Sequence, residues 1–356
     1  MKNQKVLLFG LILCLLVVQL ACNLPVRPNL PLAFNPQDVI PDMLARTSTS
    51  QWQSWIEKLS GAVPVTVDGK PTVITTRYNY AMFAGQENAQ AFEFLLEQLR
   101  NWVDEDQIEI DPYPYTDAEH TYTWKNIIVT LPGSTRPKEA VVLSAHFDST
   151  VVREGDPLLV SPGANDNGTG VATLLEAVRL FSHYRFERTL RIIFFSGEEH
   201  GLAGSRAYVQ DHATDDIVAM LNLDMFGYDS NGDRCIELHV GTLPSADPVG
   251  QAFVQSIQQY QLNLTYDYLT DQATDRSDHA SFWEKGVGAV AVIENFFDNN
   301  LPNGCQGVDA NPSYHRPGDA MQNVNVPCAL DVARAALITT AKLAGPISSR
   351  WLFTPR

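Results

Sequence analysis

The chain has 356 residues, of which 41 are Asp or Glu and 25 are Lys or Arg, so its formal net charge is −16. With 45% hydrophobic and 19% charged residues, this is a globular composition, and it excludes a disordered chain or a disulfide-dense miniature domain. No basic stretch is present that could neutralise a phosphate backbone, so we expect no nucleic-acid partner.

The N-terminus has the pattern of an export signal. A lysine-containing start precedes an uncharged apolar run at positions 6–20, as in the n-region and h-region of a signal peptide. Residues 19–22 resemble the lipobox of bacterial lipoproteins, although Gln19 stands where an aliphatic residue is expected. We predict cleavage before Cys22 and lipidation of that residue, which would anchor the chain to a membrane. Plain secretion and an uncleaved anchor are the alternatives.

All three alternatives export the rest of the chain, and the leading one places it on the outer face of a bacterial membrane. The segment after Cys22 is rich in proline and has the composition of a semi-stiff extended spacer. We therefore divide the chain into a signal peptide at 1–22, a tether at 23–41, one catalytic-size domain at 42–346 and a C-terminal tail at 347–356.

Three cysteines, Cys235, Cys305 and Cys328, lie beyond the signal peptide and Cys22. An oxidising compartment permits one disulfide among them. We predict the pair Cys305–Cys328, which would close a loop worth roughly 3 kcal/mol in the chain-entropy model. Three buried free thiols are the alternative.

Within the domain, helical and strand-like patterns alternate. Apolar residues at helical spacing predict a helix at 86–103, a second beginning near Thr169 and a shorter one at 51–59. Continuous apolar runs predict buried strands at 126–131, 141–145, 190–195, 219–223 and 289–293. Such runs are typical of strands covered on both faces, so we predict a mostly parallel α/β sheet in a single domain.

Potential metal ligands follow these strands at their carboxyl ends. They are His146 and Asp148, Glu198 and Glu199, and Asp224, with Asp166 in a glycine-rich loop between the first two strands. Parallel strands place these ends at one edge of the sheet, where several carboxylates cannot all stay ionised without positive charge. No Lys or Arg lies in the strand-end motifs.

Each of these residues alone has an ordinary structural explanation, such as a helix cap or a turn. Together they favour divalent metal ions. Zinc accepts imidazole nitrogen and carboxylate oxygen, and a pair of ions about 3.5–4 Å apart needs a shared carboxylate. Asp166 is the natural bridge.

Six ordered motifs resemble the co-catalytic di-zinc aminopeptidases, including secreted bacterial leucyl-type and aminopeptidase Y-like enzymes. Glutamate carboxypeptidases and glutaminyl cyclases are more distant relatives. The motifs are AHFDS (145–149), GANDNGTG (163–170), FFSGEEHGLAGS (194–205), NLDM (222–225), RSDHASF (276–282) and YHRPGD (314–319). The resemblance implies the phosphorylase/hydrolase-like fold of zinc-dependent exopeptidases, an α/β domain with helices on both faces of the sheet.

The resemblance also implies the ligand set of two zinc ions. One ion would be bound by His146 and Asp224 and the other by Glu199 and His315, with Asp166 bridging both. Cobalt or manganese are conceivable substitutes, given the affinity order of divalent metals.

Further roles follow from the same resemblance. Glu198 would be the general base, Asp148 would orient the ligand histidine, and the peptide bond between Asp166 and Asn167 would be cis. Some secreted members have a tyrosine that stabilises the oxyanion just before the SDH motif, but residues 272–276 contain none. Tyr314 is either a substitute donor or a packing residue. Supporting positions without an assigned catalytic role are Asp278, His279 and Asp319, and His200 needs no role.

The predicted reaction is hydrolysis of the N-terminal bond of peptides with a free N-terminus. A glutaminyl cyclase-like enzyme, a carboxypeptidase acting on acidic dipeptides and a non-catalytic binding ectodomain are the alternatives. The ectodomain would be marked by replaced ligands or a replaced base, and all of these residues are present.

Overall fold

The computed structural model describes residues 39–81, 87–297, 304–305 and 307–349. The chain divides into the units 1–34 and 35–356, and all described residues belong to the second unit. The predicted signal peptide and nearly all of the tether lie outside the described residues, as does 350–356. None of the helices in the described part is long and apolar enough to cross a membrane.

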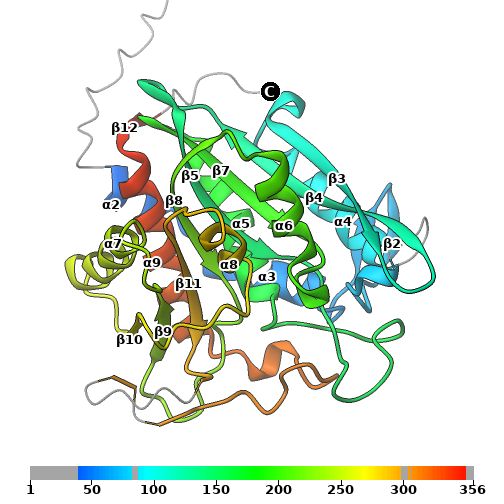
Figure 1. Cartoon of the computed structure of the whole chain (residues 1–356). Helices are drawn as coiled ribbons and strands as arrows, with labels where there is room; N and C mark the ends of the chain where they lie inside the picture. The colour runs from blue at the N-terminus through cyan, green and yellow to red at the C-terminus, as the bar shows by residue number, and fades with distance from the viewer. Residues whose placement is uncertain (1–38, 82–86, 298–303, 306, 350–356) are drawn as a thin grey trace, which may run out of the picture. The chain divides into compact units, whose positions relative to one another are not determined.

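Eight strands of the described chain form one mixed sheet (Figure 1). Its order is β10-β9-β11-β8-β5-β7-β4-β3. The central strands β11, β8, β5 and β7 are parallel, while β3 and β4 at one edge and the β9–β11 pair toward the other are antiparallel. The strands are β3 (Ile108–Thr116), β4 (Thr121–Leu131), β5 (Arg136–His146), β7 (Arg188–Phe195), β8 (Asp216–Leu223), β9 (Cys235–His239), β10 (Thr265–Leu269) and β11 (Ala289–Glu294).

Helices cover both faces of the sheet. The helices α5 (Gly168–Phe181) and α9 (Val326–Ala344) pack on β5 and β7, and α3 (Thr49–Leu59) and α4 (Glu87–Leu99) pack on α5. The other face is covered by α6 (Ala203–Asp211) and α8 (His279–Trp283). The remaining helices are α2 (Val39–Ala45) and α7 (Asp247–Gln259), and two small antiparallel pairs are formed by β1 (Val65–Val67) with β2 (Lys70–Thr72) and by β6 (Tyr184–Phe186) with β12 (Pro346–Ser349).

The predicted α/β fold is confirmed, and every predicted strand lies within one of β4, β5, β7, β8 and β11. The helix predicted at 86–103 ends earlier, at Leu99, because the chain tightens there and the Trp102 N–H bonds the Leu99 carbonyl. The first described helix, α2, begins three residues before the predicted domain start at Asp42.

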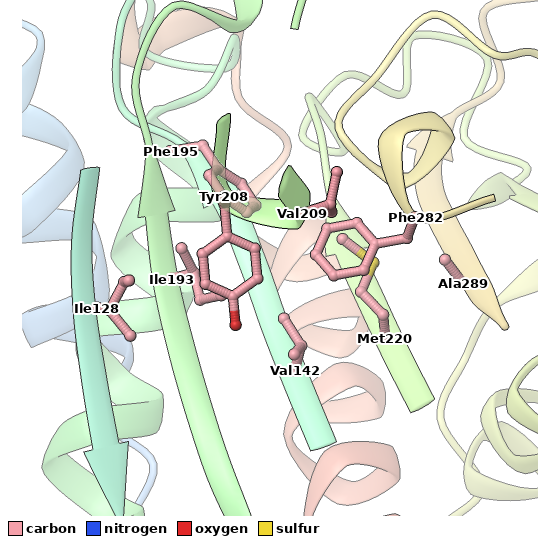
Figure 2. Packing of buried hydrophobic residues seen from close by; sticks show 9 residues of the cluster. All are labelled: Ile128, Val142, Ile193, Phe195, Tyr208, Val209, Met220, Phe282 and Ala289. Carbon is pink, nitrogen blue, oxygen red and sulfur yellow. The ribbon is translucent and has the colours of Figure 1, made fainter. Parts of the chain in front are cut away.

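The core between the sheet and the α6–α8 layer is a continuous apolar cluster. Figure 2 shows Tyr208 and Val209 of α6 and Phe282 of α8 over side chains from five strands. The strand residues are Ile128, Val142, Ile193, Phe195, Met220 and Ala289. Burial of this kind is the main favourable term in folding, and here it fixes the central strands whose ends carry the polar site.

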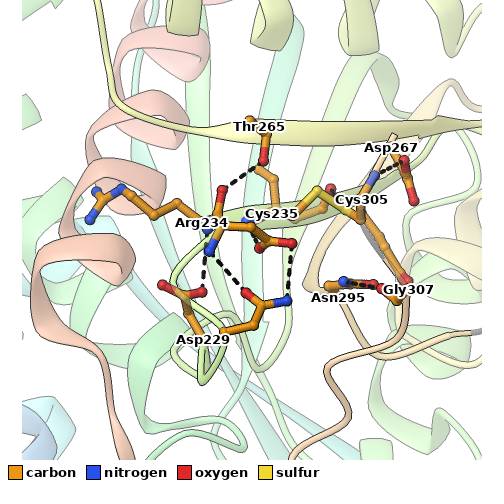
Figure 3. Close-up of a disulfide and its surroundings, with 12 residues drawn as sticks. Asp229, Arg234, Cys235, Thr265, Asp267, Asn295, Cys305 and Gly307 are labelled. Atoms are coloured by element: carbon orange, nitrogen blue, oxygen red, sulfur yellow. Dashed lines mark hydrogen bonds between the residues drawn. A yellow bond between two sulfur atoms is a disulfide. The ribbon is translucent and has the colours of Figure 1, made fainter. Parts of the chain in front are cut away.

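The predicted disulfide Cys305–Cys328 is wrong. Cys305 is bonded to Cys235 at the start of β9, with the two Cα atoms 5.5 Å apart, and Cys328 is a buried free thiol in the first turn of α9 (Figure 3). Asp267 of β10 accepts the Cys305 N–H at 2.7 Å, which holds this segment beside the sheet edge. The prediction considered only the entropy of loop closure. Which two thiols come within bonding distance is set instead by the packing of the sheet.

We expect the substitution Cys235→Ser to lower the free energy of unfolding by roughly 2–5 kcal/mol, because it removes the cross-link from the unfolded chain. Urea unfolding measures the loss. The matched control is Cys328→Ala, which keeps the bridge.

Burial raises the pKa of the Cys328 thiol to about 12, so this thiol should resist alkylation in the native protein at pH 8. A peptide map that joins Cys305 to Cys328 would contradict this arrangement.

Candidate metal centre

The carboxyl ends of three central strands place potential ligands side by side. β5 ends on His146, β8 ends one residue before Asp224, and β7 runs into the short 3-10 helix η4 (Glu198–His200). Gly197, at φ +70°, makes the sharp turn between β7 and η4. The predicted convergence at one edge of the sheet is therefore present, from segments far apart in the sequence.

The donor atoms form two groups. In the first, Nε2 of His146 lies 3.1 Å from an Asp224 carboxylate oxygen and 3.3 Å from Oδ1 of Asp166. In the second, Nε2 of His315 lies 2.9 Å from a Glu199 oxygen and 3.3 Å from Oδ2 of Asp166. Asp166 thus turns one oxygen to each group, and each triad has donor atoms within 4.8 Å of one another.

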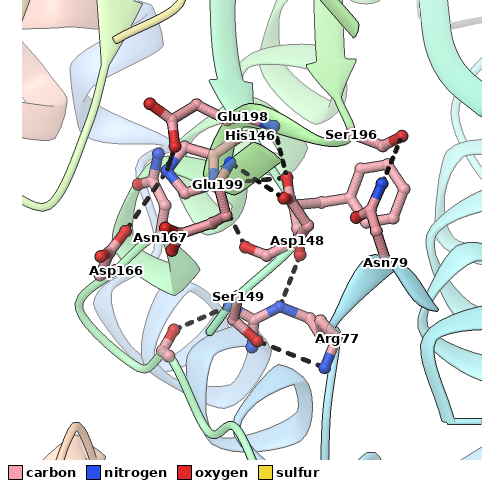
Figure 4. A network of polar contacts seen from close by, with 12 residues as sticks. Arg77, Asn79, His146, Asp148, Ser149, Asp166, Asn167, Ser196, Glu198 and Glu199 are labelled. Atoms are coloured by element: carbon pink, nitrogen blue, oxygen red, sulfur yellow. Dashed lines mark hydrogen bonds and ion pairs between the residues drawn. The ribbon is translucent and has the colours of Figure 1, made fainter. Parts of the chain in front are cut away.

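Asp148 and Glu198 lie against these groups. Oδ1 of Asp148 is 3.6 Å from Nδ1 of His146, and its two oxygens accept the backbone N–H groups of Glu198 and Glu199 at 3.3 Å each (Figure 4). The Asp148 carboxylate therefore holds the start of η4, while its backbone carbonyl, 3.2 Å from Nδ1 of His146, orients the histidine ring. A Glu198 oxygen lies 4.0 Å from Nε2 of His146 and lines the pocket beside the donors.

The bridging position of Asp166 is held from both sides. The carboxylate of Asp319 accepts the N–H groups of Asn165 and Asp166 at 2.9 Å each. Asn167 caps α5 through the Gly170 N–H and donates its amide to the Leu223 carbonyl, next to Asp224. The Asp166–Asn167 peptide bond is cis, as the motif resemblance implied.

Sequence reasoning missed Arg77, which is fully buried beneath the site (Figure 4). Its guanidinium donates to the carbonyls of Leu59, Phe147, Pro162 and Gly163 at 2.6–2.8 Å. It thereby joins the segment after β5 to the glycine-rich loop that carries Asp166. A lone arginine in an otherwise neutral stretch has no sequence signal for this role.

The charges of the site fit divalent cations. Burial and the Asp166 carboxylate raise the pKa of Glu199 to about 7, and burial with neighbouring Asp224 and Glu199 raises the pKa of Glu198 well above its ordinary value. The Glu199 oxygen Oε1 is buried without a partner among the described residues. Crowded carboxylates with an unpaired oxygen and two imidazoles are the donor set that zinc accepts.

The supporting residues of the sequence analysis lie nearby but outside both donor groups. Asp278 and His279 are fully buried, and the His279 ring contacts the Thr274 carbonyl at 2.9 Å. His200 packs among aromatic rings such as Tyr80, in keeping with no chemical role. Tyr314 stacks on the His315 ring with centroids 3.7 Å apart and lines the pocket.

A pocket opens beside the donors. Its further lining residues are Met225, Arg276, Ile293, Phe297 and Tyr314. Two buried residues of β9 hold its walls: Glu237 accepts the Phe297 N–H at 2.9 Å, and His239 Nδ1 accepts the Thr274 N–H at 3.0 Å. The remaining His239 nitrogen therefore donates to Glu237, 3.1 Å away, and the pair ties both wall segments to the sheet.

We expect Arg77→Met to lower the free energy of unfolding by about 3–5 kcal/mol, because four carbonyls would lose their charged donor inside the protein. Zinc affinity should fall by about ten- to a hundredfold, since the glycine-rich loop is no longer fixed. Urea unfolding and zinc titration measure the two effects. The same change at exposed Arg100, Arg100→Met, should stay within about 0.5 kcal/mol of the parent. Equal effects at both positions would refute the role of Arg77.

The chain is similar to known aminopeptidases and to a glutaminyl cyclase. A probable leucine aminopeptidase of Trichophyton verrucosum is 26% identical over 322 residues, 88% of this chain and 78% of the relative. A zinc aminopeptidase from Bacillus subtilis is 24% identical with a TM-score of 0.51, over 64% of this chain and 52% of that chain. A glutaminyl cyclase of Porphyromonas gingivalis is 16% identical with a TM-score of 0.61, over 83% of this chain and 98% of that chain.

At these identities the two structures establish the fold alone. The model of peptidase family M28 matches residues 126–340, more than half of the chain, and this span contains both donor groups and Glu198. The chain belongs to peptidase family M28 and is a metal-dependent peptidase.

Proposed function

We propose that this peptidase is an aminopeptidase that removes single residues from the N-terminus of peptides, with two zinc ions and Glu198 as general base. The observation that carries the proposal is the pair of donor groups that share Asp166, one oxygen facing each group. A shared carboxylate between two three-residue groups is the arrangement of co-catalytic metal sites.

The residues present fit zinc. His146, Asp224 and Asp166 would hold one ion, and His315, Glu199 and Asp166 the other. Zinc bound there would supply Lewis acidity, which polarises a carbonyl and lowers the pKa of water.

Glu198 is placed to move the proton of the reaction. It lines the pocket beside both donor groups. The Asp148 carboxylate accepts the backbone N–H of Glu198 and so fixes the backbone at that residue. From this position the Glu198 carboxylate can take a proton from the attacking water and return it to the leaving amine.

Carboxylates in the pocket provide negative charge that would pair with the substrate's free amino group. Oxygens of Asp166, Glu198 and Asp224 line the pocket, so a protonated or coordinating N-terminus would lie at its acidic end and the first side chain would lie along the other walls. Burial of this end gives the amine little competition from water. This arrangement supports a preference for peptide N-termini over internal bonds.

The likeness to a glutaminyl cyclase is one of fold. The described residues provide two complete donor groups, whereas the cyclase alternative needs a single zinc ion. The presence of the whole donor set and of Glu198 also counts against the non-catalytic ectodomain. The aminopeptidase is therefore the stronger proposal.

We also propose that the chain is exported and lipidated at Cys22. The apolar run at 6–20 and the following cysteine support this, and the Cys235–Cys305 disulfide is the kind of bond that persists outside the reducing cytosol. The peptide substrates would then be extracytoplasmic.

Glu198→Gln should lower kcat for a leucyl peptide by about 10²–10⁴-fold with little change in KM, because an amide cannot accept the water proton. Steady-state kinetics measure the loss, and zinc content should stay unchanged. The matched control is Glu284→Gln, an exposed carboxyl that pairs with Arg206. A Glu198→Gln enzyme with parental kcat would overturn the assignment.

Metal analysis tests the shared carboxylate. The mature chain should hold two zinc ions and lose N-terminal cleavage on chelation. Asp166→Asn should lower occupancy at both positions, because each group loses an oxygen, whereas His315→Ala should lower it mainly at one. Elemental analysis of the dialysed proteins gives the counts. A single ion in the parent, with cyclised N-terminal glutamine as product, would instead support the cyclase.

A further inference from the structure

The pocket beside the metal centre has an acidic end, formed by Asp166, Glu198 and Asp224, and mostly apolar side chains along its other walls. Met225, Ile293 and Tyr314 belong to a buried hydrophobic cluster, and Phe297 packs against it. Arg276 is the only arginine or lysine that lines this pocket among the described residues. A guanidinium in such a place is unnecessary for packing an apolar side chain.

The Arg276 guanidinium is not neutralised by the protein. It lies over the Phe297 ring, with Cζ 5.6 Å from the centroid, and it is exposed to solvent without an ion pair to any other described residue. Arg153, whose Cζ lies 4.5 Å from the centroid of the Tyr314 ring, likewise has no carboxylate partner there. In a chain with 41 acidic and 25 basic residues, two arginines on pocket-lining rings remain available for an external anion.

The two segments beside the Arg276 guanidinium, at Thr274 and at Phe297, are hydrogen-bonded to β9. The Arg276 N–H bonds the Thr274 hydroxyl at 3.3 Å, Thr274 is bonded to His239, and Phe297 is bonded to Glu237. The guanidinium and the ring beneath it are therefore carried by segments tied to β9. Because the backbone on both sides is fixed before an anion binds, less of the chain has to be ordered on binding.

We propose that this pocket selects an N-terminal residue whose side chain ends in a carboxylate, with Arg276 as the specificity-determining residue. The methylene groups of glutamate or aspartate would lie along Met225 and Ile293, and the carboxylate would accept charge-assisted hydrogen bonds from Arg276. Arg153, at the Tyr314 ring, would add a second positive charge. This inference rests on the proposed aminopeptidase function and names its substrate class.

The test compares glutamyl and glutaminyl coumarin amides, which have nearly the same shape, differ in charge and contain no C-terminal carboxylate. The zinc-loaded parent should show a higher kcat/KM for the glutamyl amide. Arg276→Leu should reduce the glutamyl-to-glutaminyl ratio by at least about tenfold, as expected for a lost hydrogen bond to a charged group. Arg276→Glu should shift the preference to lysyl amide. Arg100→Leu, which removes an exposed positive charge paired with Glu105, should leave the ratio unchanged.

The C-terminal carboxylate of a dipeptide is the other anionic group that Arg276 would be able to bind. If Arg276→Leu leaves the ratio intact but impairs hydrolysis of leucyl-glycine relative to leucyl-glycinamide, the side-chain assignment is overturned. A parent without preference for the glutamyl amide overturns it as well.

A binding measurement separates this inference from the proposed function. Glutamate hydroxamate should raise the melting temperature of the zinc-loaded parent more than glutamine hydroxamate, and Arg276→Leu should abolish the difference. If this result holds while no amide or peptide is cleaved, the aminopeptidase function fails and the carboxylate site stands. If leucyl and glutaminyl amides are cleaved but the hydroxamates bind alike, the carboxylate site fails and the function stands.

Discussion

Mutual repulsion among buried carboxylates is the constraint on which this structure depends. Asp148, Asp166, Glu198, Glu199 and Asp224 meet at one edge of the sheet with only two imidazoles among them. Such a group is stable only with added positive charge, and Asp166 turns one oxygen toward each of the two donor groups. The need for bound cations therefore accounts for the arrangement of these residues independently of any reaction.

The fold meets this constraint by tying the ligands to rigid elements. His146 and Asp224 follow parallel strands, and Asp148 connects η4 to the histidine ring. Asp166 lies in a loop, which would be the weakest support, but Asp319 binds its backbone and Arg77 binds the carbonyls before it. Hydrogen bonds to charged groups thus hold a candidate ligand that no strand positions.

The pocket next to this centre is supported separately. The Glu237–His239 pair belongs to β9, a strand in the antiparallel part of the sheet, and it touches no metal-ligand candidate. Met225 follows the candidate ligand Asp224, whereas the wall segments of Arg276 and Phe297 are held by β9. Changes in the wall segments can alter the preferred side chain while the donor geometry is kept, which is how Arg276 gives this chain its own preference in our proposal.

The sequence by itself determined the central strands, the helices α3, α4 and α5 and the residues at the strand ends, because these depend on local periodicity and on the topology of parallel sheets. It predicted the family and the five candidate ligands by motif. Only the tertiary structure decided the β4–β7 and β9–β11 antiparallel pairings, the Cys235–Cys305 bond and the contacts of Arg77 and Arg276. Each of these joins segments that are not neighbours in the chain, and neither hydrophobic pattern nor loop length specifies which distant side chains the packed sheet brings together.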